Sequence, residues 1–120
     1  MTKKEFIEEL QRMKLDPNDF VILAGGSLLL RGLREETADM DLQCSAKLYE
    51  RFKWDDDIPV NPDIAIEISG VYGVVSFYDS DIVEGFRCQT LESILEMKKR
   101  LNRPKDQEDI RKIEEILKCE

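Results

Sequence analysis

A glycine pair and two closely spaced aspartates are the residues of this chain whose types and spacing could do chemistry. Gly25 and Gly26 follow a short apolar run, and Ser27 opens an apolar segment with helical character. A strand that passes through two glycines into a helix presents unpaired backbone N–H groups, and glycine lets a phosphate approach the backbone closely. Ser27 adds a hydroxyl donor at the same place. Taken alone, the dipeptide is explained as well by a tight turn in which Ser27 caps the helix.

Asp39 and Asp41 stand one residue apart in a stretch that alternates polar and apolar residues. Because side chains alternate across a strand, both carboxylates are predicted to face one way while Met40 and Leu42 face the core. Two carboxylates on one face repel each other unless a cation or a proton relieves them. Such oxygen-rich sites suit Mg²⁺, which completes its octahedron with substrate phosphates and water. The alternative is a solvated acidic strand end.

A third carboxylate can join this pair from the strictly alternating segment 63–69. Its register places Asp63 and Glu67 on one face and three isoleucines on the other. The two acidic residues lie about 13 Å apart at about 3.3 Å per residue, so only one can serve the same metal site. We favour Glu67 because it is embedded in the strand, whereas Asp63 follows a proline at its start.

Lys98 is an unusual residue for the helix face on which it is predicted to lie. A helical wheel over residues 91–101 places it near the middle of an apolar stripe. A lysine in that position needs an anionic partner or a route to solvent. A pair with Asp106 would satisfy both groups, whereas in the functional alternative Lys98 reaches phosphate oxygens or a reacting hydroxyl. Snorkelling at the helix edge is the remaining explanation.

The elements that must position these residues alternate between helices and strands. Apolar runs and period-two alternation predict five strands, at 20–24, 38–45, 63–69, 70–79 and 82–88. Helical spacing predicts a first helix capped by Thr2 and Glu5, followed by helices at 25–33, 46–52, 90–101 and 104–117. We therefore expect an α/β (α+β) fold: one small domain over residues 1–120, with a mixed central sheet of about five strands flanked by helices.

Composition narrows the classes of function. The 120 residues, 42% of them hydrophobic, suffice for one ordinary core. The longest apolar run is far too short to span a membrane and no signal sequence is evident, so we predict a soluble, cytoplasmic protein without membrane contact. Histidine is absent and the three cysteines are scattered, which excludes histidine-based catalysis and argues against zinc sites and disulfides.

The formal charge of −8 makes nucleic acid an improbable partner, because phosphate binding normally requires a basic surplus. A small substrate, a protein partner or metal-screened phosphates fit an acidic chain better. Catalysis would then depend on carboxylates, lysine, serine, tyrosine or a bound hard cation.

Taken together, these residues resemble the nucleotidyltransferase superfamily with the DNA polymerase beta-like core. The resemblance covers about residues 20–117 and begins with the glycine turn, the Asp39–Asp41 pair and a third acid at Glu67 or Asp63. The last two helices also resemble a small bacterial branch related to AbiEii-type toxin enzymes and antibiotic nucleotidyltransferases. That part of the resemblance is carried by Lys98, Arg103, Lys105 and Asp106.

The resemblance implies a nucleotidyltransferase fold and the transfer of a nucleoside monophosphate from an NTP to an acceptor hydroxyl, with release of pyrophosphate. Magnesium, as two ions, would be the cofactor. The implied phosphate-binding residues are Gly25, Gly26, Ser27, Arg34, Lys98 and Lys105. The implied metal ligands are Asp39 and Asp41, joined by Glu67 or Asp63, and the third acid could instead activate the acceptor hydroxyl.

A non-catalytic protein is the alternative function. The same fold with a vestigial site could act as a protein-binding, antitoxin-like regulatory partner, and an acidic, small chain suits that function too. A second subunit could also supply residues to complete the site of so small a domain, in which case the protein would be a homodimer. The identity of the acceptor is not encoded in any motif that we can identify.

Overall fold

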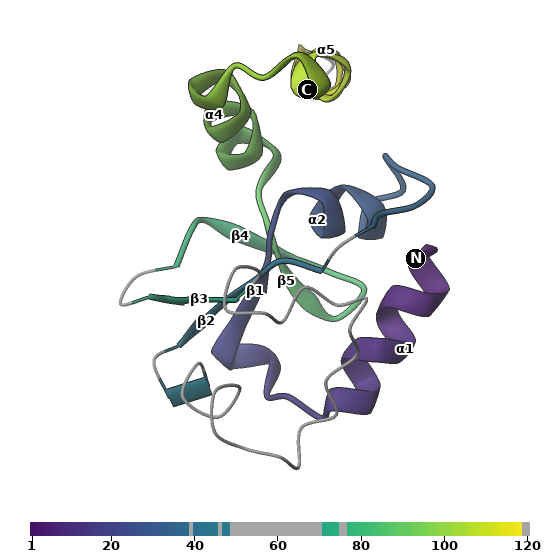
Figure 1. Cartoon of the computed structure of the whole chain (residues 1–120), viewed down its shortest axis with the longest axis vertical. Coiled ribbons are helices and arrows are strands. Elements are labelled where there is room, and N and C mark those ends of the chain that lie inside the picture. Colours follow the sequence, from purple (N-terminus) through teal and green to yellow (C-terminus); the bar gives the residue numbers. More distant parts are fainter. Residues whose placement is uncertain (39, 46, 49–70, 75–76, 119–120) are drawn as a thin grey trace.

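The computed structural model describes residues 1–38, 40–45, 47–48, 71–74 and 77–118. Across these residues the protein has the predicted mixed α+β fold, in which helices pack on a mixed β-sheet (Figure 1). In this part of the chain no helix is both long enough and apolar enough to cross a membrane.

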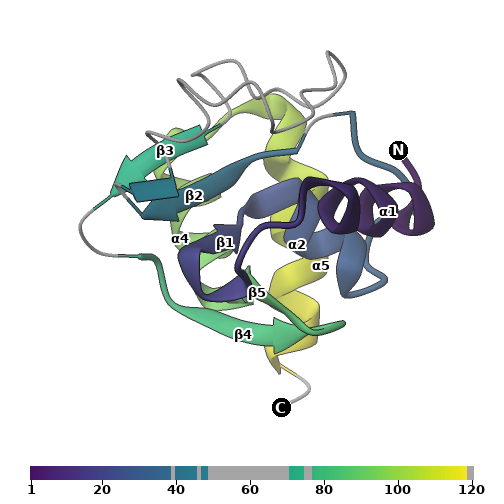
Figure 2. The same cartoon turned by 90° about the horizontal axis from the view of Figure 1, so that it is seen from below.

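Five strands form one sheet within the described residues. They are β1 (Phe20–Ile22), β2 (Leu42–Ser45), β3 (Val71–Val74), β4 (Ser80–Val83) and β5 (Phe86–Gln89). The strand order is β3-β2-β1-β5-β4. β1 is antiparallel to β2 and parallel to β5, whereas β2 is parallel to β3 and β4 is antiparallel to β5. The short β1 therefore occupies the centre, with two strands on either side of it (Figure 2).

The described helices are α1 (Lys3–Met13), α2 (Ala24–Leu30), α4 (Leu91–Leu101) and α5 (Gln107–Lys118), with 3₁₀ turns at Pro17–Asp19 and Pro104–Asp106. Two of these helices, α1 and α4, begin at a residue with a capping side chain. The predicted capping box of α1 is confirmed, because Thr2 and Glu5 exchange side-chain and backbone hydrogen bonds. Thr90 caps α4 by accepting a hydrogen bond from the Ser93 N–H.

α2 lies in the middle of the molecule. Leu29 and Leu30 belong to the main core, together with buried residues of α1 and the sheet. Leu28 packs instead with Ile94 of α4 and Ile113 of α5. A helix that is apolar on all sides must be covered on all sides, and Figure 1 shows α2 between the sheet and the last two helices. The turn that precedes α2 is thereby held between these layers.

The prediction of a single strand over 82–88 is wrong. The segment contains a tight hairpin, in which Glu84 and Gly85 have φ values of +56° and +82° and separate β4 from β5. Two residues with positive φ form the turn that matches the twist of paired strands. The usual sequence signal for this turn is Asn-Gly or Asp-Gly, which the Glu84–Gly85 pair does not provide.

The predicted helices 90–101 and 104–117 agree with the structure. The predicted strands 38–45 and 70–79 are longer than the observed ones, because β2 begins at Leu42 and residues 77–79 are not part of a strand. β1 is shorter than the predicted strand 20–24, because Ala24, the last residue of that predicted strand, already belongs to α2. The predicted strand 63–69 lies outside the described residues. Of the predicted helix 46–52 the structure describes Lys47 and Leu48, which are helical.

Candidate functional site

A cavity of about 270 Å³ lies where the first turn of α2, which contains Gly25 and Gly26 and is called the glycine turn below, meets the last two helices. Six predicted site residues line it: Gly25, Gly26, Arg34, Asp41, Lys98 and Lys105. The other lining residues are Ala24, Thr37, Ala38, Arg103, Asp106 and Asp109. The fold thus brings together three segments that are far apart in the sequence. The predicted ligands Asp39, Asp63 and Glu67 lie outside the described residues.

Asp41 reaches the cavity because of the pairing between β1 and β2. Ile22 pairs with Leu42, and one residue beyond this pair the Leu23 N–H donates to the Asp41 carbonyl at 3.0 Å. Met40 and Leu42 are fully buried, while Asp41 is half-buried. The predicted alternation around Asp41 is therefore confirmed, and its carboxylate lies beside the glycine turn.

The glycine turn leaves one backbone donor facing the cavity. The N–H groups of Gly26 and Ser27 both donate to the Leu23 carbonyl, at 3.1 and 3.3 Å. The Ala24 N–H is bound by a glutamine side chain at 3.0 Å. Within the described part of the chain, the Gly25 N–H makes no hydrogen bond. Gly25 is therefore the residue of this turn whose N–H is ready to bind an anion.

The two glycines are needed for different reasons. A methyl group on Gly25 would lie 2.8 Å from Arg34 Nη1 and 3.0 Å from Thr37 Oγ1, both on the cavity wall. A methyl group on Gly26 would lie 2.7 Å from the Phe6 ring in the core. Gly25 thus lets polar side chains approach the backbone inside the site, whereas Gly26 lets α1 pack against α2.

Ser27 does not have the role predicted for it. Its side chain is fully buried, and Oγ donates to the Gln89 carbonyl at 2.7 Å and accepts from Arg31 Nε at 3.1 Å. A hydroxyl whose bonds are used inside the core is not accessible to a phosphate. Ser27 instead joins α2 to β5 through the Gln89 carbonyl.

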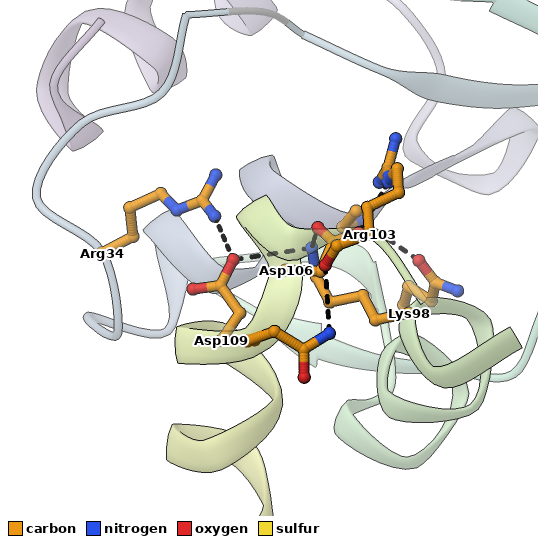
Figure 3. A network of polar contacts seen from close by, with 8 residues as sticks. Arg34, Lys98, Arg103, Asp106 and Asp109 are labelled. Atoms are coloured by element: carbon orange, nitrogen blue, oxygen red, sulfur yellow. Dashed lines mark hydrogen bonds and ion pairs between the residues drawn. The ribbon is translucent and has the colours of Figure 1, made fainter. Parts of the chain in front are cut away.

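Five charged side chains form one network along the cavity (Figure 3). Lys98 Nζ donates to Asp106 Oδ1 at 2.8 Å and lies 3.5 Å from Asp109 Oδ2. Arg103 Nε donates to the other oxygen of Asp106 at 2.6 Å, and Arg34 donates to Asp109. Asp109 therefore lies between Arg34, from the loop after α2, and Lys98, from α4.

The predicted pair of Lys98 and Asp106 is confirmed. Their side chains are 5% and 4% exposed, so water contributes little to their solvation. Burial by itself would raise the pKa of Asp106, but the hydrogen bonds from Arg103 and Lys98 outweigh it and hold this pKa below its usual range. Asp106 is thus ionised at neutral pH, and its ion pair with Lys98 fastens α4 to the turn that precedes α5.

Among the residues that the structure describes, the charged side chains of the cavity carry a small cationic excess, whereas the chain as a whole is acidic. Four cationic side chains line it: Arg34, Lys98, Arg103 and Lys105. Three carboxylates oppose them, on Asp41, Asp106 and Asp109. A small cationic excess within a chain of net charge −8 requires that basic residues be gathered here. Such a cavity attracts a compact anion such as a phosphate.

The described residues of the cavity offer carboxylate oxygens, which are the ligands that hard cations such as Mg²⁺ prefer. Asp41 brings carboxylate oxygens to the cavity, and neither a thiol nor an imidazole lines it. Among the residues that the structure describes, no cluster of three metal-binding side chains occurs. The described residues therefore offer Asp41 as a carboxylate of the kind that Mg²⁺ prefers, while the predicted ligand Asp39 lies outside them.

A second cavity, of about 370 Å³, lies on the other side of α4. It is lined by aromatic and mostly acidic side chains and contains none of the predicted site residues. Asp79 of this cavity belongs to a second D-x-D sequence, Asp79-Ser80-Asp81. Spacing alone therefore does not define the site, since Asp41 lines the cavity with the two glycines whereas Asp79 does not.

Two lining residues escaped the sequence analysis. Thr37 is buried on the wall of the cavity, and its N–H donates to the Met1 carbonyl at 2.9 Å. No sequence pattern indicates this placement. Asp109 stands three residues after Asp106 on α5, a spacing that puts both on one helix face and could have signalled a shared partner for Lys98.

The chain was compared with protein-family models, curated proteins and solved structures, and no match was found in any of the three. Its function must therefore be inferred from the site itself.

Proposed function

We propose that the protein is a Mg²⁺-dependent nucleotidyltransferase, which transfers a nucleoside monophosphate from an NTP to an acceptor hydroxyl and releases pyrophosphate. The observation that carries the proposal is the gathering of Gly25, Asp41 and four cationic side chains around one cavity of an acidic protein. These features are the ones that binding of a metal-complexed triphosphate requires.

The triphosphate would be held by donors from three parts of the chain. The Gly25 N–H donates to one phosphate oxygen. Arg34 keeps N–H donors for another oxygen, since a guanidinium has five and the bond to Asp109 uses few of them. Lys105 is exposed at the cavity and can turn its ammonium group toward the phosphates.

Lys98 has a different role from the one that the resemblance implies. Its ammonium group is buried and bound to Asp106, with Asp109 nearby, so its hydrogen-bonding capacity is largely used. It supplies positive potential at the cavity wall and holds α4 against α5, which carries Asp109. Lys98 therefore orients phosphate-binding groups rather than acting as the main phosphate ligand.

Asp41 and Asp39 would hold Mg²⁺, as the resemblance implies. When bound, Mg²⁺ neutralises phosphate oxygens and stabilises the charge of the leaving pyrophosphate. The residues of the chain then keep the phosphates in line, and this positioning provides much of the rate acceleration in phosphoryl-type transfers. Glu67 or Asp63 remains the proposed third carboxylate.

Thermal unfolding with each of the four NTPs, with and without Mg²⁺, tests the proposal. A ligand at about 100 times its dissociation constant stabilises by roughly 2.7 kcal/mol, which raises the melting temperature by roughly 8 to 16 °C in a domain of this size. The shift should require Mg²⁺ and disappear in Asp39→Ala/Asp41→Ala.

The control is Asp79→Ala, which removes a carboxylate of another D-x-D sequence outside the cavity. This variant should keep the full nucleotide shift. If folded wild-type protein shows no shift with any NTP, the nucleotidyltransferase proposal is wrong, and a non-catalytic, protein-binding function becomes the better explanation.

A further inference from the structure

Gln89 is a fully buried polar residue at the end of β5, close to the proposed nucleotide site but outside the cavity. Its Oε1 accepts from the Ala24 N–H at 3.0 Å, and its Nε2 donates to Ser93 Oγ at 2.9 Å. Its backbone carbonyl accepts from Ser27 Oγ at 2.7 Å and from Arg31 Nη2 at 3.0 Å. One residue therefore connects the glycine turn, α2 and the start of α4.

The side-chain amide of Gln89 supplies the acceptor that the Ala24 N–H needs and a donor for Ser93 Oγ. A backbone N–H requires an acceptor, which the amide oxygen provides, and the amide nitrogen then faces the serine hydroxyl. In the described residues, no buried side-chain nitrogen or oxygen lacks a hydrogen-bond partner. An apolar side chain of the same length in place of Gln89 would leave Ala24 without its acceptor.

Ala24 needs this bond more than an ordinary residue does. Its φ is +33°, a value that residues with a side chain rarely adopt. The bond from its N–H to Gln89 fixes this conformation, and the next residue along the chain, Gly25, is then presented to the cavity.

The amide nitrogen of Gln89 binds α4, the helix that carries Lys98 to the other wall of the cavity. Ser93 lies in the first turn of α4, and its own N–H is bound by the cap residue Thr90. Lys98, further along the same helix, lines the cavity and binds Asp106. The position of Gln89 thus links the two walls, one with the Gly25 N–H and one with the ion-pair network.

We propose that Gln89 is a positioning residue for the nucleotide site: its buried amide sets the separation between the glycine turn and α4, and thereby between the Gly25 N–H and the ion-pair network that Lys98 holds in place. The inference rests on the proposed function for its ligand, while the positioning of the turn is a property of the protein alone. Gln89 touches no substrate and is not a catalytic residue.

The test compares Gln89→Met with Gln43→Met. Gln43 is 6% exposed, and its Oε1 accepts from the Tyr78 N–H at 2.8 Å, away from the cavity. Both changes remove a buried amide that binds a backbone N–H, so both should lower stability. A purely structural role for Gln89 would make the two variants alike in every other respect.

The first readout is amide hydrogen exchange without nucleotide, measured for Ala24 relative to Ile113 in α5. In Gln89→Met the relative protection of the Ala24 amide should fall at least about tenfold, as expected for loss of one hydrogen bond, and in Gln43→Met it should not change. Equal Ala24 protection in wild type and Gln89→Met would overturn the positioning of the turn.

The second readout is the dissociation constant for Mg²⁺ and each NTP, measured by calorimetry. Gln89→Met should weaken binding about tenfold, and Gln43→Met less than about twofold. Loss of Ala24 protection with unchanged nucleotide affinity would overturn the proposal, because the role would then be structural only. If wild type binds no nucleotide, the proposed function fails, and the exchange measurement still decides whether Gln89 positions the turn.

A second variant covers the case in which Gln89→Met does not fold. Ser93→Ala removes one partner of the amide and keeps the bond to Ala24. It should weaken nucleotide binding at least about threefold while Ala24 keeps its protection, and unchanged binding would contradict the link to α4.

Discussion

Neutralising Asp106 should destabilise the protein strongly, because its carboxylate compensates two cations at once. Asp106→Asn keeps the shape of the side chain and removes the charge that Lys98 and Arg103 face at 2.8 and 2.6 Å. Breaking a buried ion pair costs about 3 to 5 kcal/mol. Lys98 keeps Asp109 at 3.5 Å, and Arg103 is 43% exposed, so the lower end of about 3 kcal/mol is expected.

The loss of stability in Asp106→Asn should depend on pH and should be larger at neutral than at acidic pH. The pKa of folded Asp106 lies below the ordinary value of 3.8, so its contribution to stability is complete above that value and is lost as the pH falls below it. The difference between wild type and Asp106→Asn should therefore be full near neutral pH and should shrink below about pH 4.

Urea unfolding followed by circular dichroism across this pH range measures the difference. Glu114→Gln is the matched control, since Glu114 pairs with Lys99 at 3.6 Å on the surface, where the side chains are 42% and 53% exposed. That change should cost less than about 1 kcal/mol. If Asp106→Asn proved as stable as Glu114→Gln at neutral pH, our account of the buried network would be wrong.

Two further predictions follow from close contacts and burial. Gly25→Ala should weaken Mg²⁺–NTP binding by at least about tenfold in calorimetry while leaving most of the stability, because the new methyl group would displace the end of Arg34, only 2.8 Å away. In a Cys119→Ser variant, native protein should not react with a thiol reagent at neutral pH but should react at two sites in denaturant. Burial raises the pKa of Cys44 to about 12 and that of Cys88 to about 11, so a rapid native reaction would contradict the described packing.

Local sequence patterns predicted most of the described helices and part of the candidate site. The capping box at Thr2 and the alternation around Asp41 depend on neighbouring residues only, and both are confirmed. A lysine on an apolar stripe must find an anion, and for that reason the pair of Lys98 and Asp106 could be predicted.

Features that depend on tertiary packing could not be predicted in the same way. The direction of Ser27 is decided by the Gln89 carbonyl, which is distant in sequence. The bond from Arg34 to Asp109 likewise joins segments that only the fold brings together. The hairpin at Glu84 was missed because the turn does not have the residue pair that usually marks it.

The central claim is that the cavity beside Gly25 binds a nucleoside triphosphate, and a ¹H–¹⁵N NMR titration with Mg²⁺ and each NTP tests it most directly. We predict that the amide signals of Gly25, Thr37, Asp41 and Lys105 shift with saturable binding, while those of the exposed strand β4 do not. Signals that do not move with any NTP, or that move only away from this cavity, would contradict the account.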